Sequence, residues 1–247
     1  MGSDKLARSA VSLASLLAGL AIWEIAGRYT SPAFLVPFSE TVARLSDLLA
    51  DWGTWAQFLD SAILFLTGFM LALVIGMPAG LLFSRVRAVR VGIEPYIMIL
   101  YATPMVALIP FILSLMGFGF VPKVLVVFLF AVFPILYNTV EGARSIKPEL
   151  IEVARSFRSS EWALWREVML LPYTMTGVRQ AIGRALVGVI AAEFFLSATG
   201  LGQLIMVASQ NFDTATVFGM ILVIGLLGVG LTRIGQNIEN HFARWRN

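Results

Sequence analysis

Long uninterrupted apolar runs constrain the fold of this 247-residue chain more than any other feature of its sequence. Hydrophobic residues make up 58% of the chain and charged ones 13%, and the mean hydropathy is +0.84. Soluble domains carry roughly 25% charged residues. Several runs reach the about 20 residues that a helix needs to cross a bilayer core, whereas a transmembrane barrel would show short alternating segments. The sequence therefore predicts an all-α, polytopic membrane protein.

Six of these runs are predicted to be transmembrane helices within a single domain over residues 1–247. Their approximate ranges are 10–27, 58–83, 91–116, 121–141, 175–196 and 214–234. The first run is longer than the about 7–15 apolar residues of a signal peptide, and no small-residue cleavage site follows it. It is therefore interpreted as an uncleaved span, with Trp23 and Tyr29 as aromatic anchors at its outer end.

Two stretches outside the spans have predicted local structure. Ser39 is expected to cap a short helix that continues through Asp51 and carries an apolar face, so that this helix lies on the membrane surface or under another subunit. The sequence S-A-T-G-L-G-Q, beginning at Ser197, is expected to be an outer turn between the last two spans.

Glycines and prolines inside the spans indicate how the helices pack. Gly76 and Gly80 have the spacing that permits close helix approach, either within one subunit or to a second copy. Pro95, Pro104 and Pro110 all fall in the third span. They indicate either a helix bent around a cavity or simple packing kinks.

The distribution of the 18 lysines and arginines predicts the orientation. If the N-terminus is cytoplasmic, Arg28, Arg44 and Lys123 fall in outer segments and two arginines lie within the fifth span. All the others fall in inner segments. The positive-inside rule then places both termini and the charged segment 148–172 in the cytoplasm.

Motifs for catalysis and nucleotide binding are absent from the sequence. It has no cysteine and a single histidine, His241, close to the end of the chain. It contains no G-x-x-x-x-G-K-[ST], H-E-x-x-H or G-x-S-x-G motif, and Asp213 has no second membrane aspartate beside it. We therefore expect neither an enzyme nor a chain that binds ATP by a phosphate loop.

One side of the fifth span carries a polar stripe. At 100° per residue its members fall within about 40° of a common line: Arg179, Gly183, Leu186, Ile190, Glu193 and Ser197. Because a charge at mid-membrane costs at least roughly 2.5–3.5 kcal/mol, such residues usually face a bundle interior or water. The stripe is thus a candidate pathway lining. Alternatively, Arg179 and Glu193 reach the two membrane surfaces, or backbone donors hold Glu193.

The segment 148–172 is predicted to form two short cytoplasmic helices. Pro148 followed by Glu149 is a typical helix start, and Ser160 can cap a second helix. Aromatic residues such as Trp162 are expected either to pack against the spans or to dock into the groove of a partner.

Sequence motifs in and around this segment resemble those of a known family. E-V-A at Glu152 to Ala154, followed by L-P at Leu171 and Pro172, resembles the E-A-A loop of the membrane subunits of ATP-binding-cassette importers. From Trp23 onward, G-F-M-L-A-L-V-I-G-M-P-A-G-L, P-x-V-A-L-I-P, F-P-I-L-Y-N-T-V-E-G, G-V-R-Q-A-I-G and A-E-F-F…G-L-G-Q-L-I are similar to the nitrate/sulfonate/taurine branch.

The loop departs from the family pattern at one position. Arg158 stands where the family has a glycine, and the spacing to L-P differs by one residue. Ser159 and Ser160 are therefore expected to form the turn.

The resemblance implies a permease that pairs with a second copy, expected to be a homodimer, in a bacterial-type cytoplasmic (inner) membrane. Two cytoplasmic ATPase subunits would bind ATP and Mg, and an extracytoplasmic binding protein would deliver the solute. No cofactor in this chain and no nucleic-acid partner are implied. The residues implied in ATPase coupling are Glu152, Ala154, Arg155, Arg158, Ser159, Ser160, Glu161 and Trp162.

Two rival functions are weighed against this one. A self-contained secondary transporter would show an inverted repeat and ion-coupling groups near mid-membrane; the sequence shows no such repeat, and Glu193 is the one candidate group. The second rival, a membrane enzyme, is disfavoured because this sequence lacks the nucleophiles and the membrane His and Cys residues that such an enzyme would need. The solute is left open, because the branch transports small anions, neutral vitamins, pyrimidines and their precursors.

Overall fold

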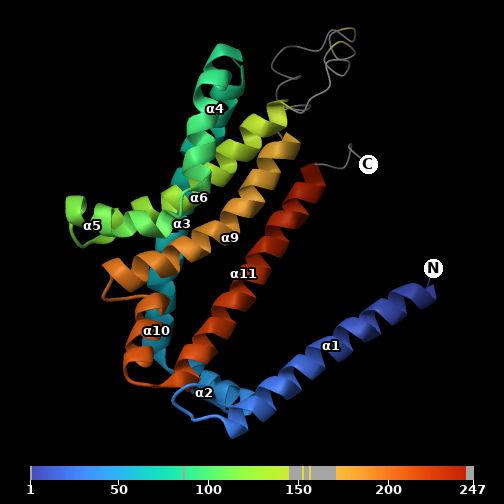
Figure 1. The fold of residues 1–247 in the computed structure, drawn as a ribbon, viewed down its shortest axis with the longest axis vertical. Helices are drawn as coiled ribbons and strands as arrows, with labels where there is room; N and C mark the ends of the chain where they lie inside the picture. Colours follow the sequence, from blue (N-terminus) through green and yellow to red (C-terminus); the bar gives the residue numbers. More distant parts are fainter. Residues whose placement is uncertain (1, 86, 145–151, 153–155, 157–170, 243–247) are drawn as a thin grey trace. The chain divides into compact units, whose positions relative to one another are not determined.

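The computed structural model describes the chain except for residues 1, 86, 145–151, 153–155, 157–170 and 243–247 (Figure 1). Every regular element in the described part is a helix, which confirms the predicted fold class. In chain order these helices are α1 (Gly2–Tyr29), α2 (Phe38–Ala50), α3 (Trp52–Arg85), α4 (Arg87–Ala102), η1 (Met105–Leu108), α5 (Ile109–Met116), α6 (Phe120–Arg144), α9 (Leu171–Leu196), α10 (Leu201–Gln210) and α11 (Thr214–Phe242).

Four of the described helices are long and apolar enough to cross a membrane on their own. Their apolar stretches are Ser9–Tyr29, Trp52–Phe83, Phe120–Gly142 and Thr214–Asn240, which match four predicted spans. Two bent helix pairs, α4 with α5 and α9 with α10, pass the same test together, which gives up to six spans. Of the two remaining predicted spans, 91–116 is broken, whereas 175–196 is continuous within α9 and the bend into α10 follows it.

The predicted span 91–116 is not one continuous helix. Its two halves, Val91–Ala102 and Met105–Met116, meet at 89°. Pro104 has no backbone N–H with which to continue α4, and a proline disfavours helical geometry in the residue before it. Pro110 then occupies the first turn of α5, where a missing N–H is harmless. Pro95, in contrast, is accommodated inside α4.

The predicted outer turn after Ser197 is shorter than expected. The turn ends at Gly200, whose φ is +103°, and α10 begins at Leu201. This helix continues for ten residues and bends from α9 by 53°. The last three residues of the predicted turn, Leu201 to Gln203, therefore lie in α10.

The described residues cluster into two compact units, and the first comprises Met1–Gln57 and Leu204–Gly225. In this unit the indole Nε1 of Trp23 donates to the Val36 carbonyl at 3.0 Å, and the Trp23 ring contacts Phe38 and Phe218. Trp23 therefore packs within this unit, whereas Tyr29 is 88% exposed. Their role as interface anchors stays a prediction.

The prediction that Ser39 caps its own helix is wrong. Pro37 is the N-cap of α2 and makes no side-chain cap. Instead the N–H and hydroxyl of Ser39 donate to the Glu24 carboxylate of α1 at 2.9 and 3.0 Å. Arg28 holds the same carboxylate at 2.6 Å. A negative group at a helix N-terminus is favourable, so Glu24 replaces the expected serine cap.

A second polar contact in this unit joins α2 to the start of α11. Arg44 donates to Asp213 at 3.2 Å and to Thr216 at 2.9 Å, and Asp213 accepts both the N–H and the hydroxyl of Thr216. Partial burial by itself would raise the pKa of the Asp213 carboxyl, but these donors hold its pKa below the ordinary value.

The second unit comprises Phe58–Gln203 and Leu226–Asn247, and its core lies between α3, α6 and α9. A Cβ on Gly80 would lie 2.9 Å from Thr139 of α6, and one on Gly76 would lie 3.1 Å from Val132. The small residues at this spacing therefore bring α3 against α6 within one subunit, which was one of the two alternatives.

Candidate functional site

Helix α9 carries several polar side chains inside its predicted span, and they contact five other helices. Glu193 reaches α3 and α10, Arg179 reaches α11, and the outward side of the helix meets α4 and α6. Each contact places a polar group of α9 in a different environment.

The Glu193 carboxyl is enclosed by α3 and the start of α10, and Glu193 is 1% exposed. Its two oxygens accept the hydroxyl of Ser61 at 2.6 Å and the backbone N–H of Gly202 at 2.7 Å. The Ser61 hydroxyl oxygen in turn accepts the N–H of Leu201 at 2.8 Å. We call Ser61, Glu193, Leu201 and Gly202 the Glu193 cluster.

Two glycines make room for this cluster. Gly200 has the positive φ of +103°, and a Cβ there would overlap the Glu193 carboxyl group. A Cβ on Gly202 would lie 2.7 Å from the Cβ of Glu193. The motif G-L-G at residues 200–202 therefore does two things: it turns the chain from α9 into α10, and it brings backbone donors up to the carboxyl group.

The Glu193 cluster supplies hydrogen-bond acceptors for the backbone N–H groups at the N-terminus of α10. The first N–H groups of a helix have no partner within it, and here Leu201 and Gly202 donate to side chains of α3 and α9. Among the described residues no buried side-chain nitrogen or oxygen lacks a hydrogen-bond partner. A polar group buried without a partner costs about 1–3 kcal/mol, so the cluster fixes the bend between α9 and α10.

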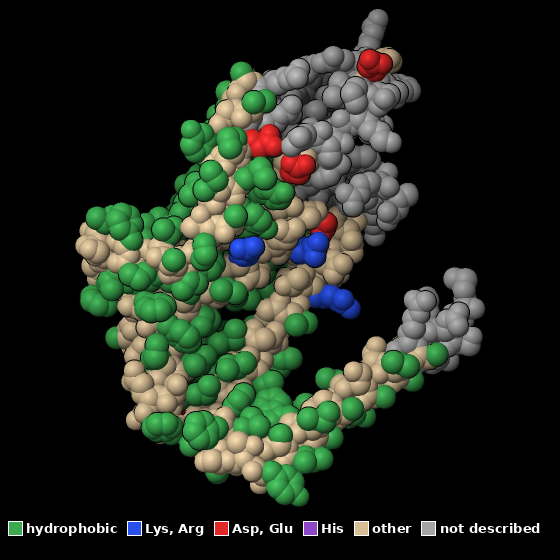
Figure 2. All heavy atoms as spheres, in the orientation of Figure 1, with side chains coloured by type: hydrophobic (Ala, Val, Ile, Leu, Met, Phe, Trp, Pro, Cys, Tyr) green, Lys and Arg blue, Asp and Glu red, His purple; other side chains and the backbone are tan. Residues whose placement is uncertain are grey.

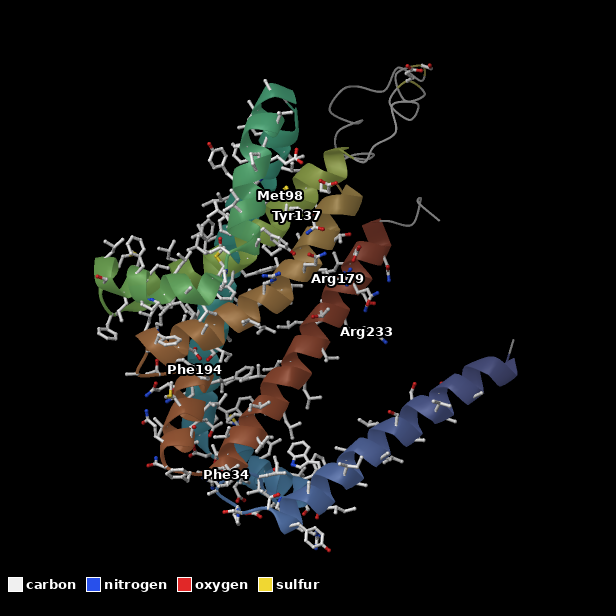
Figure 3. All side chains as sticks on the ribbon, in the orientation of Figure 1. Phe34, Met98, Tyr137, Arg179, Phe194 and Arg233 are labelled. Atoms are coloured by element: carbon white, nitrogen blue, oxygen red, sulfur yellow. The ribbon has the colours of Figure 1, made fainter. Side chains whose placement is uncertain are left out.

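Arg179 is held by α11. Its Nε lies 2.7 Å from a Glu239 carboxylate oxygen, and the Thr176 hydroxyl donates to the other oxygen at 2.7 Å. Figure 3 shows Arg179 on the side of α9 that faces α11. The ion pair is partly exposed, with side chains 33% and 14% accessible, and it links α9 to α11.

Three other members of the predicted stripe contact neighbouring helices, whereas a Cβ on Gly183 would meet nothing within 4 Å. Leu186 and Ile190 are half-buried and pack against the core, with Leu186 beside Gly228 of α11. The Ser197 hydroxyl accepts the Lys123 ammonium at 3.0 Å. The contacts at Glu193 accord with the alternative in which backbone donors hold it, and a pathway role for the stripe stays a prediction.

A different face of α9 is exposed. Gln180, Arg184 and Val187, spaced by four and three residues, are each exposed, and their common line lies roughly 100° around the helix from the predicted stripe. The guanidinium of Arg184 lies 5.0 Å from the ring centre of Tyr101 on α4, and Tyr101 stacks on Tyr137 of α6 at 4.8 Å.

Sequence reasoning placed Arg184 in the fifth span but did not select it. The tyrosines and Asn138 were missed altogether because their side chains come from other helices, so no spacing along the sequence connects them to α9. Figure 3 shows Tyr137 on α6 where this helix passes α4, which carries Met98.

The predicted coupling residues fall largely outside the described part of the chain. Glu152 is exposed, and its carbonyl accepts the Ser156 hydroxyl at 2.9 Å. The residues outside the described part are Ala154, Arg155, Arg158, Ser159, Ser160, Glu161 and Trp162. Among the side chains that the structure describes, no group of three or more His, Asp or Glu residues is placed to hold a metal ion.

Comparisons with known proteins agree on one family. Residues 68–244 match the model of the binding-protein-dependent transport system inner membrane component. The chain is 33% identical to the riboflavin transport system permease protein RibX of Chloroflexus aurantiacus, over 87% of this chain and 81% of that protein. It is 32% identical to the bicarbonate transport system permease protein CmpB of Synechococcus elongatus, over 93% of this chain and 88% of that protein.

A third relative and a solved structure extend this result. The putative aliphatic sulfonates transport permease protein SsuC of Bacillus subtilis is 28% identical, over 92% of this chain and 84% of that one. The inward-facing MetNI methionine ABC transporter shares the fold with a TM-score of 0.59 at 18% identity, covering 77% of this chain and 96% of the matched chain.

Proposed function

Because this chain belongs to the family of binding-protein-dependent transport system inner membrane components, we propose that it is the permease subunit of an ATP-driven importer. The single observation that carries this is the family match over 68–244, which includes the segment 148–172 and nearly all of the second unit. The apolar helices described above are what such a subunit requires.

The energy source is proposed to lie in separate ATPase subunits. The sequence contains no phosphate-binding loop, so ATP would have to bind elsewhere. Two cytoplasmic ATPase subunits would bind ATP and Mg and dock onto the segment 148–172. Alternation between inward- and outward-facing states would then follow from ATP binding through this contact.

The remaining partners are proposed from the family. A second permease copy would complete the solute pathway, and an extracytoplasmic binding protein would deliver the solute. The relatives are named for riboflavin, bicarbonate and aliphatic sulfonates. Because these solutes share neither size nor charge, the solute of this chain does not follow from the family.

Charge reversal in the coupling segment tests the docking proposal. The double variant Glu152→Lys and Glu161→Lys is expected to insert normally but to lose solute-dependent ATP hydrolysis when it is reconstituted with its ATPase and binding protein. Glu40→Lys, an exposed position on α2, is the control and should behave as wild type. Undiminished uptake by the double variant would contradict the docking assignment.

The orientation can be tested on the same protein. Because the chain has no cysteine, single variants Thr199→Cys and Asn240→Cys report sidedness without background. Both positions are exposed. An impermeant maleimide added outside intact cells should label Thr199→Cys and leave Asn240→Cys unlabelled until the membrane is opened. The reverse pattern would place both termini outside.

A further inference from the structure

We propose that α2 is an in-plane membrane anchor of the first unit, with one apolar face laid on a surface of zwitterionic lipid. The sequence left two alternatives open for this helix, the membrane surface or a position under another subunit. The inference goes beyond the proposed function, because it names a lipid contact that holds whatever the chain transports.

The position of α2 between two spans places it at a membrane surface. The span of α1 ends at Tyr29, and the span of α3 begins at Trp52. Figure 2 shows hydrophobic side chains along α1, as lipid contact requires of a span. Consecutive spans cross a membrane in opposite directions, so these two ends lie at the same surface, with α2 between them. Its 13 residues rise roughly 20 Å, which is too short for a bilayer core of about 30 Å.

Three sides of α2 differ in what they meet. Thr41 and Leu48 are buried, and a Cβ on Gly219 of α11 would lie 3.8 Å from the Thr41 carbonyl oxygen, so this side packs within the unit. The exposed carboxylates Glu40 and Asp47 share a second side. The third side, which we call the apolar face of α2, is exposed and consists of Val42, Ala43, Ser46, Leu49 and Ala50. At 100° per residue its middle lies roughly 150° from the packed side and roughly 110° from the carboxylates.

The chemistry of the apolar face suits hydrocarbon. Val42 and Leu49 are 45% and 44% exposed. The polar side chain of this face, Ser46, donates its hydroxyl to the Ala43 carbonyl at 2.6 Å, so the hydroxyl is satisfied within the helix and needs no water. Amphipathic helices bury such a face roughly 5–10 Å into the boundary between headgroups and acyl chains.

Two exposed tryptophans follow α2 at the start of α3. The indole Nε1 of Trp55 donates to the Leu49 carbonyl at 2.9 Å, which places its ring, 45% exposed, at the end of α2. Trp52, the first residue of the α3 span, is 84% exposed. Tryptophan is enriched where hydrocarbon meets the headgroups, because its ring is apolar and its N–H is polar. A lipid boundary at this level therefore explains the exposure of both rings.

The apolar face is small for a contact with another subunit. Stable protein–protein interfaces use roughly 20–30 residues a side, whereas this surface supplies five residues of α2 and the two tryptophans. Within the face, Val42 and Leu49 are the large aliphatic side chains. A lipid layer requires neither a minimum area nor a complementary shape, so the observations favour lipid as the occupant.

The charge of α2 indicates the kind of lipid. Its acidic residues Glu40 and Asp47 are exposed, and its basic residue Arg44 is engaged by Asp213 at 3.2 Å and by Thr216 at 2.9 Å. Helices that bind anionic lipid carry Lys and Arg on the polar face. Carboxylates at the headgroup level repel phosphatidylglycerol and suit the ammonium group of phosphatidylethanolamine.

Spin labels on single-cysteine variants test the lipid contact, since the chain has no cysteine of its own. The complex of the permease with its ATPase is reconstituted in vesicles of phosphatidylethanolamine and phosphatidylcholine. Labels on Val42→Cys and Leu49→Cys should be more accessible to oxygen than to a neutral, water-soluble nickel chelate. Asp47→Cys, on the carboxylate side of the same helix, is the matched control and should show the reverse. We expect the oxygen-to-nickel ratio to differ several-fold between the two sides.

Replacing phosphatidylcholine with phosphatidylglycerol tests the lipid class. The oxygen-to-nickel ratio at Leu49→Cys should fall in these anionic vesicles, and Asp47→Lys in the same background should restore most of the loss. If Leu49→Cys does not yield an intact complex, Ser46→Cys provides the measurement at the middle of the apolar face with little change in side-chain size.

Two results at the apolar face would overturn the lipid contact. Low accessibility to both reagents would assign the face to another subunit or to an external partner protein. Preferential accessibility to the nickel chelate would leave it in water. An unchanged or higher ratio in the anionic vesicles would overturn the lipid class. ATP-dependent uptake in the same vesicles tests the importer assignment separately.

Discussion

Replacing Glu193 with glutamine is expected to weaken the joint between α3, α9 and α10. Each carboxyl oxygen now accepts one donor, the Ser61 hydroxyl at 2.6 Å and the Gly202 N–H at 2.7 Å. Glutamine has one acceptor oxygen, and its NH₂ group would face the other donor. Either Ser61 or Gly202 would therefore lose its acceptor in a site that is 1% exposed.

The magnitude follows from the loss of one buried hydrogen bond. Leaving a buried donor without an acceptor costs about 1–3 kcal/mol, so ~2 kcal/mol is expected for Glu193→Gln. For a chain of this size each kcal/mol lowers the melting temperature by roughly 2–4 °C, which predicts a loss of roughly 4–8 °C. Glu193→Leu removes both acceptors and should cost about twice as much.

Thermal melting of the detergent-solubilised protein, followed by tryptophan fluorescence, measures this change. Asp60→Asn is the matched control, because Asp60 is an exposed carboxylate directly before Ser61 on α3. Ser61→Ala should lower the melting temperature by itself. The double variant Ser61→Ala with Glu193→Gln should lose less melting temperature than the sum of the losses in the two single variants, since the two residues share one hydrogen bond.

The reasoning fails if Glu193→Gln melts within 1 °C of the wild type or if the double variant is additive. Uptake by the same variant separates a structural role from a role in the pathway. An unchanged uptake rate across pH, after correction for the amount of folded protein, would mean that Glu193 is a structural residue.

Three further changes test other contacts. Asp213→Asn should reduce stability at neutral pH. The difference from wild type should begin to shrink below about pH 4, where the unfolded carboxyl becomes protonated, and should vanish only when the pH falls below the lowered pKa of the folded Asp213 carboxyl; melting curves at several pH values measure this. Glu239→Gln should loosen the end of α11 by weakening the Arg179 ion pair, seen as faster amide hydrogen exchange there; unchanged exchange would remove that role. Gly80→Ile should reduce the amount of folded protein in the membrane, since its Cβ would lie 2.9 Å from Thr139, whereas normal expression would contradict the close packing of α3 on α6.

The sequence by itself determined the fold class, the approximate spans and the family. Span positions depend on local properties, because about 20 apolar residues form a transmembrane helix whatever surrounds them. The predicted range 121–141 accordingly agrees with the observed apolar stretch Phe120–Gly142, and 214–234 lies within Thr214–Asn240. The close packing at Gly76 and Gly80 was also anticipated, as one of two alternatives.

Only the tertiary structure decided which way each polar side chain of α9 faces. Helical spacing correctly placed Arg179 and Glu193 on one side, but the partners that make that side a packing surface come from other helices. Those on α11 and α3 lie 60 and 132 residues away in the sequence, and the one on α10 lies beyond the turn. The cap at the start of α2 also depends on tertiary structure, because the Ser39 N–H donates to Glu24, which lies fifteen residues earlier on α1. The exposed face at Arg184 emerges only when α4, α6 and α9 are assembled, because exposure is a property of what neighbouring helices leave uncovered.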